Sequence, residues 1–158
     1  MKIIKKEVLI NAFLAAVGGF ICIGFLSYLN TSIDNIIWLI PPFGASMVLV
    51  MAANESPLAQ PKNIIFGHII SALSGFLVFY VFGDSFYSLG AGVALSIFMM
   101  IITNTVHPPA GANPIIMIMG AHEISFVILP IATGAIIIVL FAIMYSRFLG
   151  KNYPIKNN

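Results

Sequence analysis

Charged residues are scarce in this sequence. Of its 158 residues only 8% are charged, whereas 60% are hydrophobic. A soluble globular domain usually carries about a quarter charged residues. The low charge content therefore argues against an ordinary soluble domain and predicts an integral membrane protein, with the lipid bilayer as the solvent around most of the chain.

Residue types that build reactive sites are equally sparse. Cys22 is the only cysteine, so neither an intrachain disulfide nor a thiolate metal site can form from this chain. The histidines His68, His107 and His122 fall on separate segments without metal-ligand spacing,. No nucleophile–base pattern and no phosphate-binding glycine loop occurs. We therefore expect no enzyme activity, no cofactor and no bound metal.

The few charges lie at the edges of apolar runs. A charge at the centre of a membrane helix costs about 2.5–3.5 kcal/mol on insertion scales, and this placement avoids that cost. The net charge is only +2 and gives no reason to propose nucleic-acid binding. The basic residues are Lys2, Lys5, Lys6, Lys62, Arg147, Lys151 and Lys156, and the acidic ones are Glu7, Asp34, Glu55, Asp84 and Glu123.

Four apolar runs are long enough to cross a bilayer. A hydrocarbon core about 30 Å thick needs roughly 20 helical residues, and residues 8–29, 64–82, 86–106 and 124–149 meet this length. Two further runs, 36–53 and 107–120, contain proline pairs. Proline removes a backbone donor and clashes with the preceding turn, so neither is expected to be one straight helix.

These two broken segments share a pattern. Residues 41–46 and 108–113 both follow P-P-x-G-A and end on a small polar residue. Each lies between two long runs, so residues 1–158 form a single transmembrane domain with halves at about 8–82 and 86–149. Non-helical backbone inside a membrane is tolerated only where protein buries it or where it lines a watery cavity. The broken segments are therefore where a functional site is expected.

The basic residues predict the topology. Both termini are basic, which places both in the cytoplasm and requires an even number of crossings. There are six if each broken segment crosses and four if each is re-entrant; the position of Lys62 favours six. Three crossings per half would make the halves inverted repeats. The expected fold is an all-α bundle of four full transmembrane helices plus two Pro-broken segments.

The repeated pattern also predicts an anion site. Ser46 and Asn113 are suited to cap helices that begin near Ser46 and Pro114. Helix N-termini bind anions through free N–H groups and the helix dipole, without a charged side chain. Gly44 and Gly111 allow close backbone approach. The alternative is that these small residues only permit tight helix packing.

His107 directly precedes the second proline pair. A histidine titrates near neutral pH and can bind an anion or relay a proton; equally, it can bond backbone freed by the prolines. His68 is expected to pack between helices, and His122 to be solvated. The candidate substrate-binding residues are Pro42, Phe43, Gly44, Ala45, Ser46, Asn104, His107, Pro108, Pro109, Gly111, Ala112 and Asn113.

Taken together, these motifs resemble the HPP family of integral membrane proteins, named for a His-Pro-Pro motif. That tripeptide stands at residues 107–109, after P-P-F-G-A-S at 41–46 and S-P-L-A-Q-P at 56–61. The resemblance covers roughly residues 9–149. It implies a transporter, usually described as four-spanning, from a family whose plastid and cyanobacterial members are linked to nitrite transport.

The sequence therefore favours membrane transport of a small inorganic anion, with nitrite as the first candidate. The rival hypothesis is a non-transporting membrane subunit, an assembly or sensor partner. Formate/nitrite channels are also built from two inverted repeats of three helices with an interrupted middle helix. This is an analogy of fold alone. Because a 17.1 kDa bundle has little mass to enclose a pore, we expect a homo-oligomer in the cell (inner) membrane.

Overall fold

The computed structural model describes residues 5–34 and 36–155, and over these residues the chain is all-helical. The α-helices are α1 (Lys6–Ser32), α2 (Pro41–Ala52), α3 (Pro61–Phe82), α4 (Phe86–Ile102), α5 (Asn113–Met119) and α6 (Thr133–Phe148). Shorter turns are η1 (Pro57–Ala59), η2 (Pro108–Ala112) and the π-helical η3 (Val127–Ala132), which leads into α6. The all-α prediction is confirmed.

Three helical stretches of the described chain are long and apolar enough to cross a membrane, rather than the four expected. They are Lys6–Ser32, Pro61–Phe82 and Val127–Phe148. The run at 86–106 yields the 17-residue helix α4, which ends at Ile102. The left-handed φ of 53° at Asn104 prevents the helix from continuing, and Pro108 disfavours a return to helical backbone at His107.

Both Pro-broken segments form short helices, as predicted. α2 has 12 residues and α5 has 7. Each broken segment enters through non-helical residues, 36–40 and 105–107. Neither is one straight transmembrane helix.

The expected capping is wrong. α2 begins at Pro41 rather than near Ser46, and its N-cap, Ile40, makes no side-chain hydrogen bond. Asn113 is the first residue of α5 and does not cap it either, since the N-cap is Ala112. Proline presets the backbone for the first helical turn, so α2 starts at its proline pair. Ser46 then lies in the second turn, with its side chain free to point inward.

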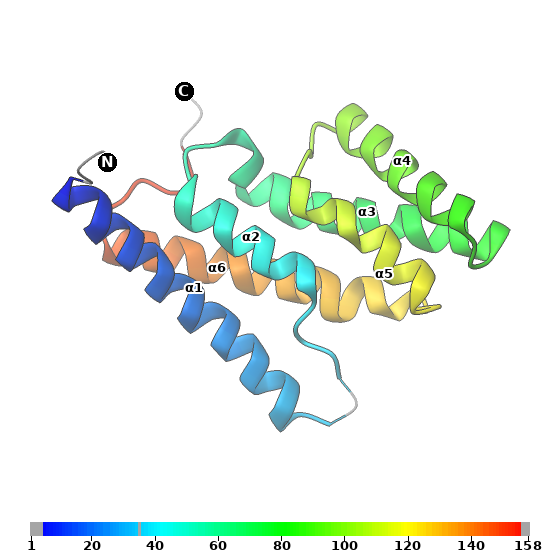
Figure 1. The fold of residues 1–158 in the computed structure, drawn as a ribbon, viewed down its shortest axis with the longest axis horizontal. Coiled ribbons are helices and arrows are strands. Elements are labelled where there is room, and N and C mark those ends of the chain that lie inside the picture. The colour runs from blue at the N-terminus through cyan, green and yellow to red at the C-terminus, as the bar shows by residue number, and fades with distance from the viewer. Residues whose placement is uncertain (1–4, 35, 156–158) are drawn as a thin grey trace.

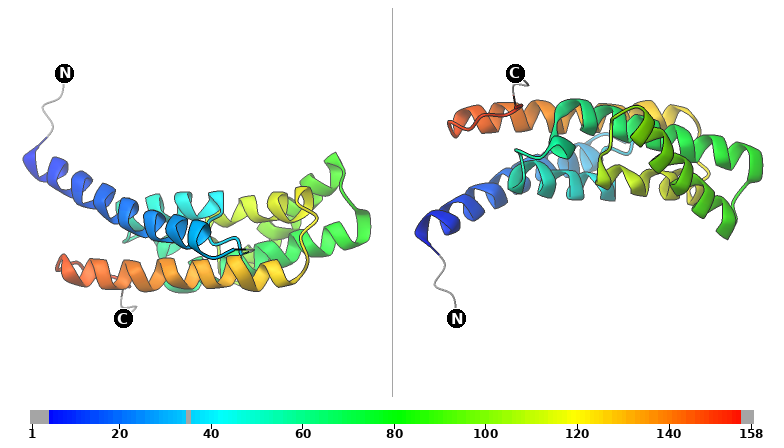
Figure 2. Two further views of the ribbon diagram at one scale, coloured as in Figure 1. Left: turned by 90° about the horizontal axis from the view of Figure 1, so that it is seen from below. Right: turned by 90° about the horizontal axis from the view of Figure 1, so that it is seen from above.

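Figure 1 shows where the chain reverses direction. The N- and C-terminal ends of the described chain and the α2–α3 connection lie at one end of the molecule, and the α3–α4 turn lies at the opposite end. α3 and α4 pack against each other as a hairpin, and α6 runs alongside. Figure 2 shows α1 leaving the rest of the bundle at an angle. Few residues of its apolar span are buried.

Small residues on α3 let the second broken segment approach its backbone. A Cβ added at Gly67 would lie 2.8 Å from His107 Cβ, and one added at Gly75 would lie 2.5 Å from the Cα of Pro114. On α4, a Cβ at Gly92 would lie 3.2 Å from Pro114 Cβ. Pro114 is therefore packed closely between α3 and α4, against a glycine of each, as is usual for close helix contacts in membranes,.

Candidate functional site

Four polar side chains meet in the interior of the bundle. Ser46 comes from α2, His68 from α3, His107 from the residue before η2, and Asn113 from the start of α5. Each has a relative exposure of 0%. Buried polar groups are stable only when they are hydrogen-bonded. We call these four residues the buried polar cluster.

The hydroxyl of Ser46 lies at the centre of this cluster. Its Oγ is 2.9 Å from Nε2 of His68 and 2.8 Å from Nε2 of His107. It also lies 3.1 Å from the carbonyl oxygen of Pro42, one turn earlier in α2. One hydroxyl therefore joins α2 to α3 and to the second broken segment.

The outer nitrogens of the two imidazoles are also bonded. His107 Nδ1 lies 2.8 Å from the carbonyl oxygen of Leu58. The amide nitrogen of Asn113 lies 2.9 Å from His68 Nδ1 and 3.0 Å from the His68 carbonyl oxygen. A continuous row of hydrogen bonds thus runs from Asn113 through His68, Ser46 and His107 to Leu58.

These partners assign the positions of the protons. A carbonyl oxygen only accepts, so Nδ1 of His107 carries hydrogen and its Nε2 is bare when the ring is neutral. The Asn113 amino group must face the His68 carbonyl, so His68 Nδ1 accepts and its Nε2 carries hydrogen. Ser46 then accepts from His68 and donates to His107. With both imidazoles neutral, every hydrogen bond in the row has one donor and one acceptor.

One acceptor in the cluster is left over. Asn113 Oδ1 is buried and has no hydrogen-bond partner among the described residues. An unpaired buried acceptor costs about 1–3 kcal/mol. This oxygen is therefore available to the N–H or O–H of a bound molecule.

Packing and a second polar layer fix the cluster in place. The Phe43 ring meets the His68 ring edge-on, with centroids 5.5 Å apart, and fills the space over Gly134 of α6. Behind the cluster, Ser71 donates to the carbonyl oxygen of Ala110, and Ser96 donates to Ser71 at 2.9 Å. Both broken segments are thereby held against the long helices.

The α2–α3 connection holds Leu58 in position. The Gln60 amide donates to the carbonyl oxygens of Asn54 and Ser56, at 2.9 Å in each case. Next to Leu58, the Ala59 carbonyl accepts the Tyr153 hydroxyl at 2.8 Å. Burial raises the pKa of Tyr153, which keeps this hydroxyl a donor. The carbonyl that receives His107 is therefore part of a rigid connection.

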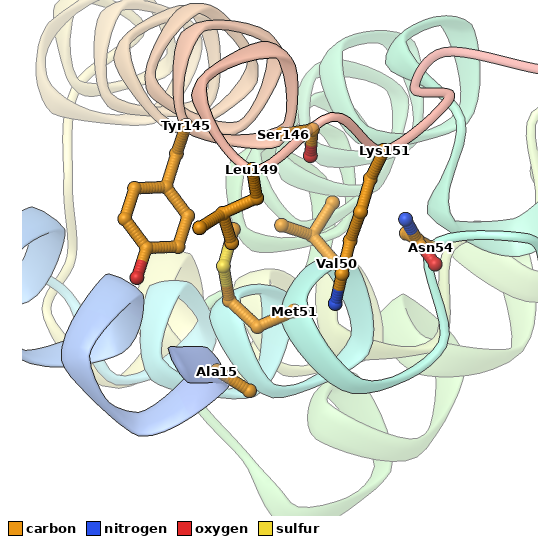
Figure 3. Close-up of a pocket in the computed structure, with 8 residues that line it drawn as sticks. All are labelled: Ala15, Val50, Met51, Asn54, Tyr145, Ser146, Leu149 and Lys151. Carbon is orange, nitrogen blue, oxygen red and sulfur yellow. The ribbon is translucent and has the colours of Figure 1, made fainter. Parts of the chain in front are cut away.

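A separate small hollow lies near the terminal end of the bundle. Figure 3 shows Tyr145 directed toward α1, and its hydroxyl donates to the Leu14 carbonyl at 2.7 Å. This hollow lies at the interface of α1, α2 and α6 and is separate from the buried polar cluster. Its lining residues are Ala15, Val50, Met51, Asn54, Tyr145, Ser146, Leu149 and Lys151.

The structure brings together five of the candidate residues. Ser46, His107 and Asn113 belong to the buried polar cluster, Pro42 supplies a carbonyl to it, and Phe43 contacts its His68 ring.

The other seven candidates lie outside the cluster. Ala45, Asn104 and Pro108 are exposed, and Gly44, Pro109, Gly111 and Ala112 are half-buried. A Cβ at Gly44 or Gly111 would meet no atom within 4 Å, so tight packing within this chain does not explain those two glycines.

Sequence reasoning missed His68. It was expected only to pack between helices, and it is indeed buried there. Its ring also bonds Ser46 and Asn113 and contacts the ring of His107, so it belongs to the cluster. The available signal was its position beside Gly67 and three residues before Ser71, on one face of a helix. His122, expected to be solvated, is half-buried and stacks on Phe126, and this burial lowers its pKa.

Comparison with known proteins identifies relatives over nearly the whole chain. The family described as "HPP, transmembrane region" matches residues 5–154. A transmembrane protein of Dictyostelium discoideum is 34% identical over 151 residues, which are 90% of this chain and 53% of that protein. A second one from the same organism is 33% identical over 146 residues, 87% of this chain and 47% of that protein. The chain thus spans about half the length of these relatives. No solved structure matches it.

Proposed function

The chain belongs to the HPP transmembrane family, and from this premise we propose that it transports a small inorganic anion, with nitrite as the first candidate, through the buried polar cluster. One observation carries the proposal. Ser46 and Asn113 occupy the same position of the repeated six-residue pattern, and both bond the ring of His68. The two halves of the chain thus contribute equivalent residues to one buried site.

Packing of the helices supports an inverted repeat. α2 contacts α1 and α6, while α5 contacts α4 and α3. If the two halves are exchanged, α1 takes the place of α4, α2 that of α5, and α3 that of α6. The same helices then remain in contact. In many transporters such a relation places the substrate site where the discontinuous helices meet.

Charge placement supports the proposed orientation in the cell membrane. Lys6, Lys62 and Arg147 lie in the terminal turns of α1, α3 and α6 at the end that holds both chain ends. Asp84 lies in the α3–α4 turn at the opposite end. By the positive-inside rule the basic end is cytoplasmic. In this arrangement each broken segment counts as a crossing, and a homo-oligomer is part of the proposal.

The cluster supplies anion contacts mainly through side chains. The first two residues of α2 and of η2 are prolines, which have no N–H. The side-chain donors of the cluster are the Ser46 hydroxyl, the Asn113 amide and the two imidazoles. They are bonded to one another and to backbone carbonyls here, so an anion would have to replace some of these bonds, and a protonated imidazole adds positive charge,. All four side chains are fully buried, so the proposal requires that one broken segment moves to admit a substrate.

Nitrite flux into proteoliposomes tests this proposal. Wild type is compared with Ser46→Leu and Asn113→Leu, and with Val48→Leu, whose side chain is exposed on the same helix as Ser46. We expect flux above that of empty liposomes for wild type and Val48→Leu, and background flux for the two cluster variants. Background flux from folded wild type would reject nitrite. Such a result, together with stable association with another membrane protein, would favour the non-transporting subunit.

A further inference from the structure

The hydrogen-bond row in the buried polar cluster has one position where a proton can be added without moving a heavy atom. In the neutral row, Nε2 of His107 is bare and accepts the Ser46 hydroxyl at 2.8 Å. If a proton binds this nitrogen, the ring becomes a donor toward Ser46. The Ser46 hydrogen must then point elsewhere.

Ser46 has a second acceptor within reach. The Pro42 carbonyl oxygen lies 3.1 Å from Ser46 Oγ. A hydroxyl has one hydrogen to donate and two lone pairs to accept with. In the protonated cluster, Ser46 accepts from Nε2–H of both imidazoles and donates to Pro42. Every donor again has an acceptor, and only the hydroxyl hydrogen has rotated.

A second proton finds no such position. The remaining bare nitrogen, Nδ1 of His68, faces the Asn113 amino group, so protonation there would set two donors against each other. The amide cannot turn over, because its amino group also donates to the His68 carbonyl. In addition, the centroids of the two imidazoles lie 5.1 Å apart, where two positive rings repel each other.

The row also ends in groups that do not pass protons on. At one end, Nδ1–H of His107 donates to the Leu58 carbonyl, which cannot release a hydrogen of its own,. At the other end stands the Asn113 amide. A proton can therefore be held in the cluster but cannot be conducted along it.

Among residues 5–34 and 36–155, no other charged side chain lies on the elements packed around His107 except one exposed lysine. The elements packed around His107 and η2 are α2, η1, α4 and α5, which contain no Asp, Glu, Lys, Arg or His, and α3, which supplies His68. The only charged residue of α3, Lys62, is exposed. Tyr153 faces Ala59 rather than the imidazoles.

We propose that the buried polar cluster binds a single proton, on Nε2 of His107, and that rotation of the Ser46 hydroxyl from His107 to the Pro42 carbonyl accompanies its uptake. The bound proton gives the site one positive charge for an anion to neutralise. This makes the proton the coupling ion, a role that rests on the proposed function. The proton site itself does not depend on what is transported.

Nuclear magnetic resonance of ¹⁵N-histidine-labelled protein in lipid nanodiscs tests the site without any transport assay. His122→Gln, outside the cluster, leaves only the two cluster rings to observe. At neutral pH we expect hydrogen on Nε2 of His68 and on Nδ1 of His107. On acidification we expect His107 alone to gain a proton. The reverse tautomers, protonation of both rings, or no protonation of His107 while the protein stays folded would each overturn the proposal.

Two Ser46 variants test the role of the hydroxyl. Ser46→Thr retains a hydroxyl at this position, so His107 should titrate as it does in the wild type. Ser46→Ala removes the acceptor for the new N–H, so protonation of His107 should require a pH lower by about one unit or more. Equal titration in the Ala and Thr variants would contradict the hydroxyl's part.

A vesicle assay tests storage against conduction. Proteoliposomes that hold a pH gradient and a trapped pH-sensitive dye are compared with empty liposomes under the same conditions. Without nitrite, both should lose the gradient at the same rate. With nitrite, the proteoliposomes should lose it faster than the empty liposomes. A rapid leak without nitrite would replace proton storage by proton conduction. If nitrite is not transported but the expected His107 titration is observed, the proposed function fails while the proton site stands.

Discussion

Residues 41–46 begin a regular 12-residue helix, whereas residues 108–112, with nearly the same sequence pattern, form a short turn before a 7-residue helix. The two segments are also anchored by different forces. In the described structure the first is held by apolar packing, with Phe43 buried against His68 and over Gly134. Its side-chain hydrogen bonds to other elements both come from Ser46, which bonds the rings of His68 and His107.

The second segment is held by polar contacts and by backbone proximity. Ser71 donates to the Ala110 carbonyl, and the Asn63 amide donates to the Val106 carbonyl at 2.9 Å. Pro114 lies between Gly75 and Gly92. Hydrogen bonds depend on direction, whereas the hydrophobic effect does not. The two broken segments are therefore anchored by contacts of different kinds, mainly apolar for the first and mainly polar for the second.

Filling the groove under the second segment should have the largest effect. A Cβ at Gly75 would lie 2.5 Å from the Pro114 backbone, so Gly75→Val is expected to prevent stable folding. The buried thiol of Cys22, the only cysteine, reports unfolding when it reacts with a thiol-specific dye during heating. Gly111→Ala is the control, because a Cβ there meets nothing within 4 Å. If both variants melted at the same temperature, close packing at Gly75 would not be what holds the second segment.

Removing the apolar anchor of α2 should have the next largest effect. Phe43 is fully buried, and truncating a buried phenylalanine to alanine costs about 3–5 kcal/mol. Phe43→Ala should therefore lower the melting temperature in the same thiol assay. Phe20→Ala, where the ring is 80% exposed in this chain, serves as the control. A loss no greater than that of Phe20→Ala would show that packing does not anchor α2.

The sequence predicted where the two broken segments lie but not how the buried polar cluster between them is assembled. The proline pairs placed both broken segments correctly, because proline acts locally on backbone and on hydrogen bonding. The start of α2 was misplaced, since the suitability of Ser46 as a cap competed with the preference of proline for the first turn, and proline prevailed,.

Partners set by tertiary structure could not be predicted. His68 joins the cluster because the orientation of α3 brings its ring between Ser46 and Asn113, and no local pattern encodes that orientation. Leu58 takes part through its backbone carbonyl, which its side chain does not reveal. The short α4 depends on the left-handed backbone of Asn104, a feature that hydropathy alone does not detect.

Weakening the polar anchor of the second segment should have a moderate effect. Ser71→Ala leaves the Ala110 carbonyl and the Ser96 hydroxyl without their shared partner, and an unsatisfied buried group costs about 1–3 kcal/mol. Ser74→Ala is the matched control one turn along α3, since that hydroxyl bonds only Ile70 of its own helix at 2.8 Å. A Ser71→Ala protein as stable as Ser74→Ala would argue that the glycine contacts alone hold the second segment.

The smallest effect is expected where the chain's last described residues secure the α2–α3 connection. Tyr153→Phe removes the hydrogen bond to Ala59, worth about 0.5–1.5 kcal/mol. Burial raises the pKa of Tyr153 above its unfolded value of about 10. The stability it contributes is therefore fully present below that pH and declines as the pH rises further, because only the unfolded chain ionises readily. Melting curves at rising alkaline pH should converge for wild type and Tyr153→Phe. A difference that stays constant with pH would mean that the pKa of Tyr153 is the same in the folded and unfolded chains, so that burial does not restrain its ionisation.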